Sequence, residues 1–78
     1  GRIAINSLTG TVVVNNSTIT SNLSSVFTSI VDNTSSSTNY IIYRTTPSTG
    51  AFTTYISPAI SNPDIVTIDY FVVNPPPF

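Results

Sequence analysis

The residues that can carry acid–base or ionic chemistry are few: Arg2, Arg44, Asp32, Asp64 and Asp69. Two carboxylates held close together can exchange protons with a substrate or bind a hard metal ion. Asp64 and Asp69 lie five positions apart on one predicted strand, so their side chains are expected on opposite faces. Asp32 lies at the end of a different predicted element. The spacing therefore predicts no carboxylate pair.

Hydroxyl groups are abundant, but the groups that activate them are missing. The chain has 12 Ser and 13 Thr, and it contains no His, Lys or Glu to act as a general base. It also has no Cys, so neither a thiolate nucleophile nor a Cys/His zinc site can form. We therefore expect a protein that is not an enzyme and that binds no cofactor or metal ion.

Several binding partners are also disfavoured by composition. The glycines, Gly1, Gly10 and Gly50, are too far apart to build a phosphate-binding loop. Two Arg residues can neutralise few phosphates, so we expect no nucleic-acid partner. No apolar stretch approaches the roughly 18 residues that a membrane-spanning helix needs, so we expect no membrane insertion.

The tyrosines offer one alternative that the sequence leaves open. Tyr40, Tyr43 and Tyr55 could stack against sugar rings on an exposed sheet face, as in a secreted glycan-binding module. Tyrosines in such a weakly charged setting more often belong to a core or to a protein interface. We therefore treat core or interface as the first interpretation and glycan binding as the second.

The surface chemistry is that of hydroxyls and amides. Charged residues make up 6% of the chain, against about 25% in ordinary soluble proteins. Hydrophobic residues still make up 40%, which is unlike a disordered chain. A free monomer normally keeps itself soluble with mixed surface charge. This composition is typical of an extracellular, Ser/Thr-rich subunit whose surface is covered by neighbours or sugars, in a cell-surface filament or a virion capsid.

Four sequons, each an Asn followed two positions later by Ser or Thr, are consistent with a glycoprotein. They begin at Asn15, Asn16, Asn22 and Asn33. Asn33 is the favoured attachment site because a long polar loop is predicted to follow it.

The size of the chain points to association. Its 78 residues make one domain, predicted over 1–73, followed by a Pro-rich arm over 74–78. A domain this small usually needs an additional source of stability, such as disulfides, a metal ion or oligomerisation. The sequence offers no cysteine for the first and no Cys/His site for the second. The predicted partners are therefore copies of the same chain or a larger coat protein. Because the chain begins at Gly1 and lacks Met, we expect initiator removal or cleavage from a precursor.

The hydrophobic pattern predicts a mostly β or α+β fold in the order β-β-α-β-β-β. Residues 2–6 and 11–14 read as strands joined by a hairpin connection at 7–10, and residues 40–45 and 51–57 as a second hairpin. Residues 64–73 read as a strand with two apolar faces, typical of a central position. The sequence thus predicts one antiparallel sheet of about five strands.

One short helix is predicted over residues 21–31. Leu23, Val26, Phe27, Ile30 and Val31 follow the i, i+3, i+4, i+7 spacing of a helical stripe. The helix is expected to cover one face of the sheet. The predicted core consists of Ile3, Ile5, Val12, Val14, Leu23, Val26, Phe27, Ile30, Ile42, Phe52, Ile68, Tyr70 and Val72.

Unprotected strand edges complete the functional hypothesis. The runs 40–43 and 65–68 are uncharged β segments, and no Lys guards an edge. In a polymer such edges become joints where a strand of one subunit adds to the sheet of the next. The sequence therefore predicts a self-assembling structural protein. The predicted inter-subunit contacts are Ile3 and Ile5 of the first strand and the arm residues Pro75, Pro76, Pro77 and Phe78.

Overall fold

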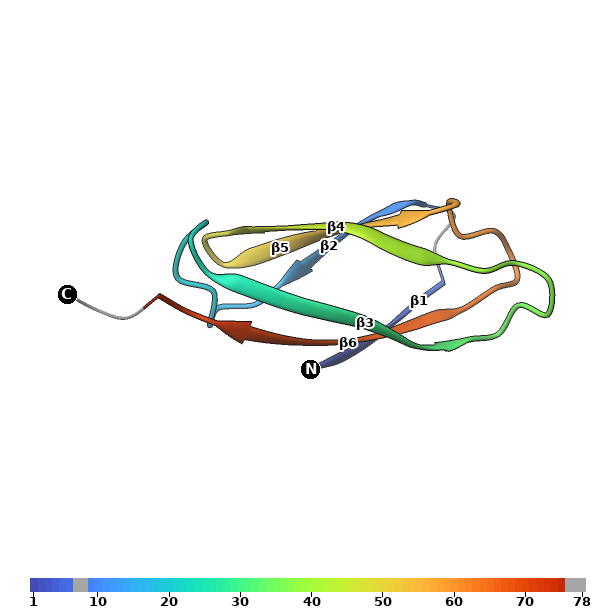
Figure 1. Cartoon of the computed structure of the whole chain (residues 1–78), viewed down its shortest axis with the longest axis horizontal. Helices are drawn as coiled ribbons and strands as arrows, with labels where there is room; N and C mark the ends of the chain where they lie inside the picture. Colours follow the sequence, from blue (N-terminus) through green and yellow to red (C-terminus); the bar gives the residue numbers. More distant parts are fainter. Residues whose placement is uncertain (7–8, 76–78) are drawn as a thin grey trace.

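The chain folds into six strands that form two small sheets (Figure 1). The computed structural model describes residues 1–6 and 9–75. The strands are β1 (Arg2–Ile5), β2 (Thr11–Asn15), β3 (Ser25–Asn33), β4 (Ile41–Ser48), β5 (Ala51–Ser57) and β6 (Val66–Val73). The predicted β-rich class is confirmed, and the described residues contain no helix.

Each sheet has three antiparallel strands. The first sheet has the order β1-β6-β3 and the second the order β2-β5-β4, in place of the single five-stranded sheet that the sequence predicted. The two sheets lie face to face in a body about 48 Å long and 18 Å wide. They approach each other at the β3 and β4 edge, where the hydroxyls of Thr28 and Thr45 are 3.1 Å apart. β6 is the central strand of its sheet, as its two apolar faces predicted.

The predicted helix over 21–31 is wrong, because residues 25–33 form β3. Val26, Thr28 and Ile30 are half-buried toward the second sheet, while Phe27 and Val31 are exposed on the other face. The helical spacing arose because both faces of this strand carry apolar residues. β-branched Val, Ile and Thr favour a strand, and that preference prevails.

The two predicted hairpins have different outcomes. The β4–β5 hairpin is confirmed, and its turn closes at Gly50 with a φ of 79°, a conformation that glycine adopts without strain. The predicted hairpin between residues 2–6 and 11–14 is wrong, because β1 and β2 lie in different sheets. Residues 7 and 8 of its predicted connection lie outside the described residues.

The interior contains two hydrophobic clusters, with Ile3 and Val12 packed against both. Ile5, Phe52 and Ile68 are buried as predicted, whereas Leu23 and Phe27 are exposed. Leu23 lies in the turn before β3 and is 75% exposed. Buried residues outside the predicted core are Ile19, Ile56, Ile60 and Val66, and Tyr40 is buried in keeping with the core-or-interface interpretation of the tyrosines.

One interior position is suited to a stabilising substitution. Thr54 is fully buried on β5, and its hydroxyl has no hydrogen-bond partner among the described residues. A buried unpaired hydroxyl costs about 1–3 kcal/mol, and Val has nearly the same shape. Thr54→Val should therefore raise the free energy of unfolding by about 1 kcal/mol and the melting temperature by about 4–8 °C. Thermal unfolding followed by circular dichroism checks this, and an unchanged or lower melting temperature would contradict it.

Candidate interaction surface

The three aspartates take part in separate contacts. Asp64 accepts a hydrogen bond of 2.6 Å from the buried hydroxyl of Tyr40, and Asp32 accepts one from the backbone N–H of Asn33. Asp69 accepts two from Arg2. Within residues 1–6 and 9–75, no three His, Cys, Asp or Glu side chains lie close enough together to hold a metal ion. Over the same residues, no helix is long and apolar enough to cross a membrane.

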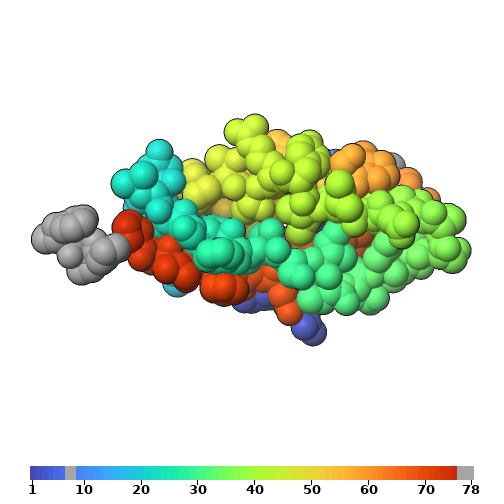
Figure 2. Space-filling view, viewed as in Figure 1, coloured from blue at the N-terminus to red at the C-terminus, as the bar shows by residue number. Residues whose placement is uncertain are grey.

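The outer face of the first sheet carries a strip of exposed apolar side chains that the polar Ser29–Asp69 pair interrupts. Phe27 of β3 and Phe71 of β6 are register partners, and their rings stack with centroids 4.8 Å apart. Val31 and Val73 extend the strip along the same two strands, and all four side chains are exposed. We call these four residues the Phe strip. Figure 2 shows the teal residues of β3 beside the red residues of β6 in the left half of the view. The sequence placed Phe27 in the core, and only its pairing with Phe71 reveals this surface.

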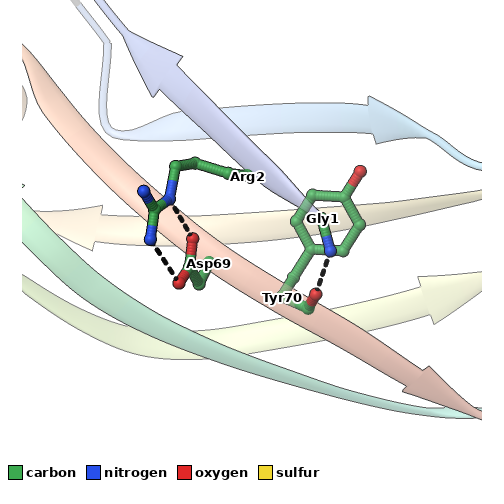
Figure 3. Close-up of polar contacts among 4 residues, drawn as sticks. All are labelled: Gly1, Arg2, Asp69 and Tyr70. Atoms are coloured by element: carbon green, nitrogen blue, oxygen red, sulfur yellow. Dashed lines mark hydrogen bonds and ion pairs between the residues drawn. The ribbon is translucent and has the colours of Figure 1, made fainter.

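A shallow pocket of about 480 Å³ adjoins the Phe strip. Arg2 and Asp69 lie on its wall as cross-strand partners, with Nε–Oδ1 and Nη2–Oδ2 distances of 2.6 and 3.0 Å (Figure 3). The residues that line the pocket are Gly1, Arg2, Phe27, Thr28, Ser29, Asp69, Tyr70 and Phe71. Its walls therefore combine aromatic rings with one ion pair, in which Arg2 and Asp69 are hydrogen-bonded to each other.

The Arg2–Asp69 pair should make a small, pH-dependent contribution to stability. The hydrogen bonds from Arg2 lower the pKa of the Asp69 carboxyl in the folded chain. A lowered folded pKa means that the stabilisation is present above the unfolded value of about 3.9 and is lost on further acidification. Asp69→Asn should therefore melt below the parent chain at pH 7, and the difference should vanish in acid.

Melting temperatures at neutral and acid pH test this expectation. Asp32→Asn removes the same charge without touching Arg2, and it serves as the control. Both partners of the ion pair are solvent-exposed. Added salt should therefore also reduce the difference in melting temperature between Asp69→Asn and the parent chain at neutral pH. A difference between Asp69→Asn and the parent chain that persisted in acid would contradict the ion-pair explanation.

The outer face of the second sheet carries two tyrosines, two exposed aliphatic residues and one cation among Thr and Ser side chains. Tyr43 is exposed on β4, and its ring centroid is 6.1 Å from that of Tyr55 on β5. The Arg44 guanidinium lies 5.2 Å from the centroid of the Tyr55 ring. Exposed Val13 and Ile41 lie on the neighbouring strand positions of this sheet. Of the three tyrosines singled out from the sequence, Tyr40 is in the core.

The four sequon asparagines differ in how free their side chains are. Asn15 and Asn22 are exposed. Asn16 accepts hydrogen bonds from the backbone N–H and hydroxyl of Thr18. Asn33 is half-buried, and its amide donates to the Thr38 carbonyl. Asn22 lies in the exposed turn before β3, and glycosylation at all four asparagines stays a prediction.

The predicted contact residues Ile3 and Ile5 lie in the edge strand β1, and Pro75 follows the central strand β6. Ile5 is buried in one cluster, and Ile3 packs against both. Directly after β6, the Asn74 side chain accepts from the Ser24 hydroxyl at 2.6 Å and donates to the Thr18 carbonyl at 2.7 Å. Asn74 therefore ties the start of the Pro-rich arm to the body. Pro75 is exposed. Pro76, Pro77 and Phe78 lie outside the described residues.

Comparison of the chain with protein-family models, with curated proteins and with solved structures gave no match. The functional interpretation therefore depends on these two surfaces and on the strand edges.

Proposed function

We propose that this chain is a structural subunit, without catalytic function, of a self-assembling extracellular filament or virion shell. The observation that carries the proposal is the presence of exposed aromatic and aliphatic side chains on the outer faces of both sheets of one small molecule. Large exposed apolar patches on small domains are typical of interaction sites. The Phe strip on the first sheet and the Tyr43–Tyr55 surface on the second lie on opposite sides of the body.

Two different interaction surfaces on one subunit favour extended assembly over a closed dimer. A face that packs on a copy of itself gives a dimer, whereas unlike faces that pack together give rings or open filaments. Arg44 on the second sheet and Asp32 on the first provide opposite charges for such a contact. Edge strands β1 and β2 have no Lys and add further sites for pairing.

The mass of the native particle tests the proposal most directly. The purified chain should form particles far heavier than its 8.3 kDa monomer, with a mass that rises with concentration, by light scattering. Electron microscopy then separates the two kinds of assembly, since a filament shows helical symmetry and a capsid shows icosahedral symmetry. A particle of monomer mass at every concentration would contradict self-assembly.

The second-sheet tyrosines favour one other candidate, a secreted glycan-binding module. An exposed Tyr43 ring beside Tyr55 and Arg44 is a surface on which a sugar ring can stack. This function requires a stable monomer that binds soluble oligosaccharides, and Tyr43→Ala should abolish the binding. An assembled particle with no affinity for glycans in an array or by calorimetry would reject it.

A further inference from the structure

The first strand has an unusual place in the fold. β1 is the first element of the chain, lies at the edge of its sheet, and pairs with β6, almost the last. Figure 1 shows these two distant segments side by side. Among the described residues, β6 is the one strand with which β1 pairs. Removing β1 would therefore leave the β6–β3 pairing and the whole second sheet in place.

β1 binds the rest of the molecule as an added peptide strand does. Its backbone runs along β6 in the register Arg2↔Asp69 to Ile5↔Val66. Alternate side chains serve different contacts, with Ile3 and Ile5 directed into the core and Arg2 bonded to Asp69 outside. Main-chain bonds combined with pockets for every second side chain are the mode of β-strand addition.

Gly1 fits this site for a steric reason. Its backbone exchanges hydrogen bonds with that of Tyr70, whose ring lies against it (Figure 3). A Cβ atom at position 1 would come within 2.5 Å of the Tyr70 ring carbon Cζ. A larger residue at position 1 would therefore require the Tyr70 ring to shift.

The chain is anchored to the body immediately after β1. The carbonyl of Thr9 accepts a 2.9 Å hydrogen bond from Ile60, and that of Gly10 accepts a 2.8 Å bond from Ile56. Residues 6–8 alone connect this anchored point to β1. A strand that lies at the edge of a sheet, pairs with one neighbour among the described residues and is followed by a short connection to the body can be exchanged between copies at low cost, because every contact is recreated.

We propose that β1 is the exchanged element of the assembly: β1 of one copy pairs with β6 of the next in the same register. The inference rests on the self-assembly proposed above and names its joint. Each copy donates one β1 and accepts one, so donor and acceptor surfaces differ, and successive exchange gives an open chain of subunits unless the rotation between copies closes it into a dimer or ring. Pairing within one chain competes at an effective concentration on the order of 1 mM, so exchange is favoured in concentrated or refolded material.

Engineered cysteines can detect the exchange, since the chain has no Cys of its own. Ala4 and Thr67 face each other across β1 and β6. Hydrogen bonding alternates along an antiparallel pair, and Gly1–Tyr70 is a bonded pair, which makes Ala4–Thr67 a non-bonded one. Such pairs have Cα atoms about 4.5 Å apart, within the range of a disulfide.

Mixing two single variants gives the first test. Ala4→Cys and Thr67→Cys chains, one isotopically labelled, are refolded together at high concentration and oxidised. A disulfide joining labelled to unlabelled chain should form at least about tenfold more than in the control mixture, as β1 exchange requires. The control is Val13→Cys with Thr53→Cys, the equivalent non-bonded pair of β2 and β5, which stays within one chain. Equal cross-linking in the two mixtures would overturn the proposal.

Locking β1 in its own chain gives the second test. The double variant Ala4→Cys/Thr67→Cys, oxidised while dilute, should lose at least about 90% of particle formation and regain it on reduction, because cis pairing then excludes exchange. Its reduced form is the matched control. A locked chain that assembles like the parent would overturn strand exchange and leave self-assembly standing. If the parent chain also stays monomeric, self-assembly itself fails.

Discussion

Phe52→Ala is expected to remove about 3–5 kcal/mol from the free energy of unfolding, the usual range for a fully buried Phe. Phe52 has no exposed surface, belongs to the second cluster, and packs against the Tyr70 ring with centroids 4.9 Å apart. At about 0.05–0.15 kcal/mol per residue, a 78-residue domain has only about 4–12 kcal/mol of stability. The melting temperature should therefore fall by more than about 12 °C, or the chain should not fold at all.

Phe71→Ala is the matched control for this substitution. Phe71 is 60% exposed and contacts mainly Phe27 on the outer face. Its removal should cost about 0.5–1.5 kcal/mol, the value of a stacked aromatic pair. Both variants are compared by thermal and urea unfolding in dilute solution, where assembly does not contribute. Similar losses for the two variants would contradict the placement of Phe52 in the core and Phe71 outside it.

The largest effect on assembly is expected from changing both rings of the Phe strip. The double variant Phe27→Thr/Phe71→Thr removes the two largest exposed aromatic side chains of the first sheet while keeping residues that favour strands. Buried aromatic anchors typically contribute about 2 kcal/mol or more each at an interface. The concentration needed for assembly should therefore rise by at least about tenfold, since about 1.4 kcal/mol corresponds to a factor of ten.

Light scattering over a dilution series measures this concentration. Leu23→Ser serves as the control, because Leu23 is the most exposed large hydrophobic residue described but lies in a turn outside the Phe strip. That variant should assemble like the parent chain. Circular dichroism must show that the double variant keeps its strands. A folded double variant that assembles at the same concentration as the parent chain would exclude the Phe strip as an interface.

Local signals in the sequence were sufficient for the β4–β5 hairpin and for β6. Pro47 and Gly50 flank the short turn, and the apolar run of 65–68 continues through both faces of a central strand. These elements depend on neighbours close in sequence. The division into two sheets does not, since a short connection fits either a hairpin or a passage from one sheet to the other.

Residues 19–31 show why other parts of the fold and the candidate surface could not be predicted from the sequence. The side chains of Phe27 and Val31 point outward into solvent. Their helical spacing had instead predicted that both face the core. Ile19 and Ile60 lie in irregular segments, where no alternation marks a buried side chain. The Phe strip could not be recognised in advance either, because its two rings come from strands more than 40 positions apart in the chain.

The scarcity of cations has a consequence for proteolysis. A trypsin-like protease cleaves after Lys or Arg, and this chain offers only Arg2 and Arg44. Both lie within strands, Arg2 bonded to Asp69 and Arg44 paired with Tyr55 across β4 and β5. A protease needs a locally unfolded segment at its cleavage site, and paired strands open rarely. We therefore expect the folded chain to resist a trypsin-like protease at Arg44, and cleavage after Arg2 to require that β1 leave β6.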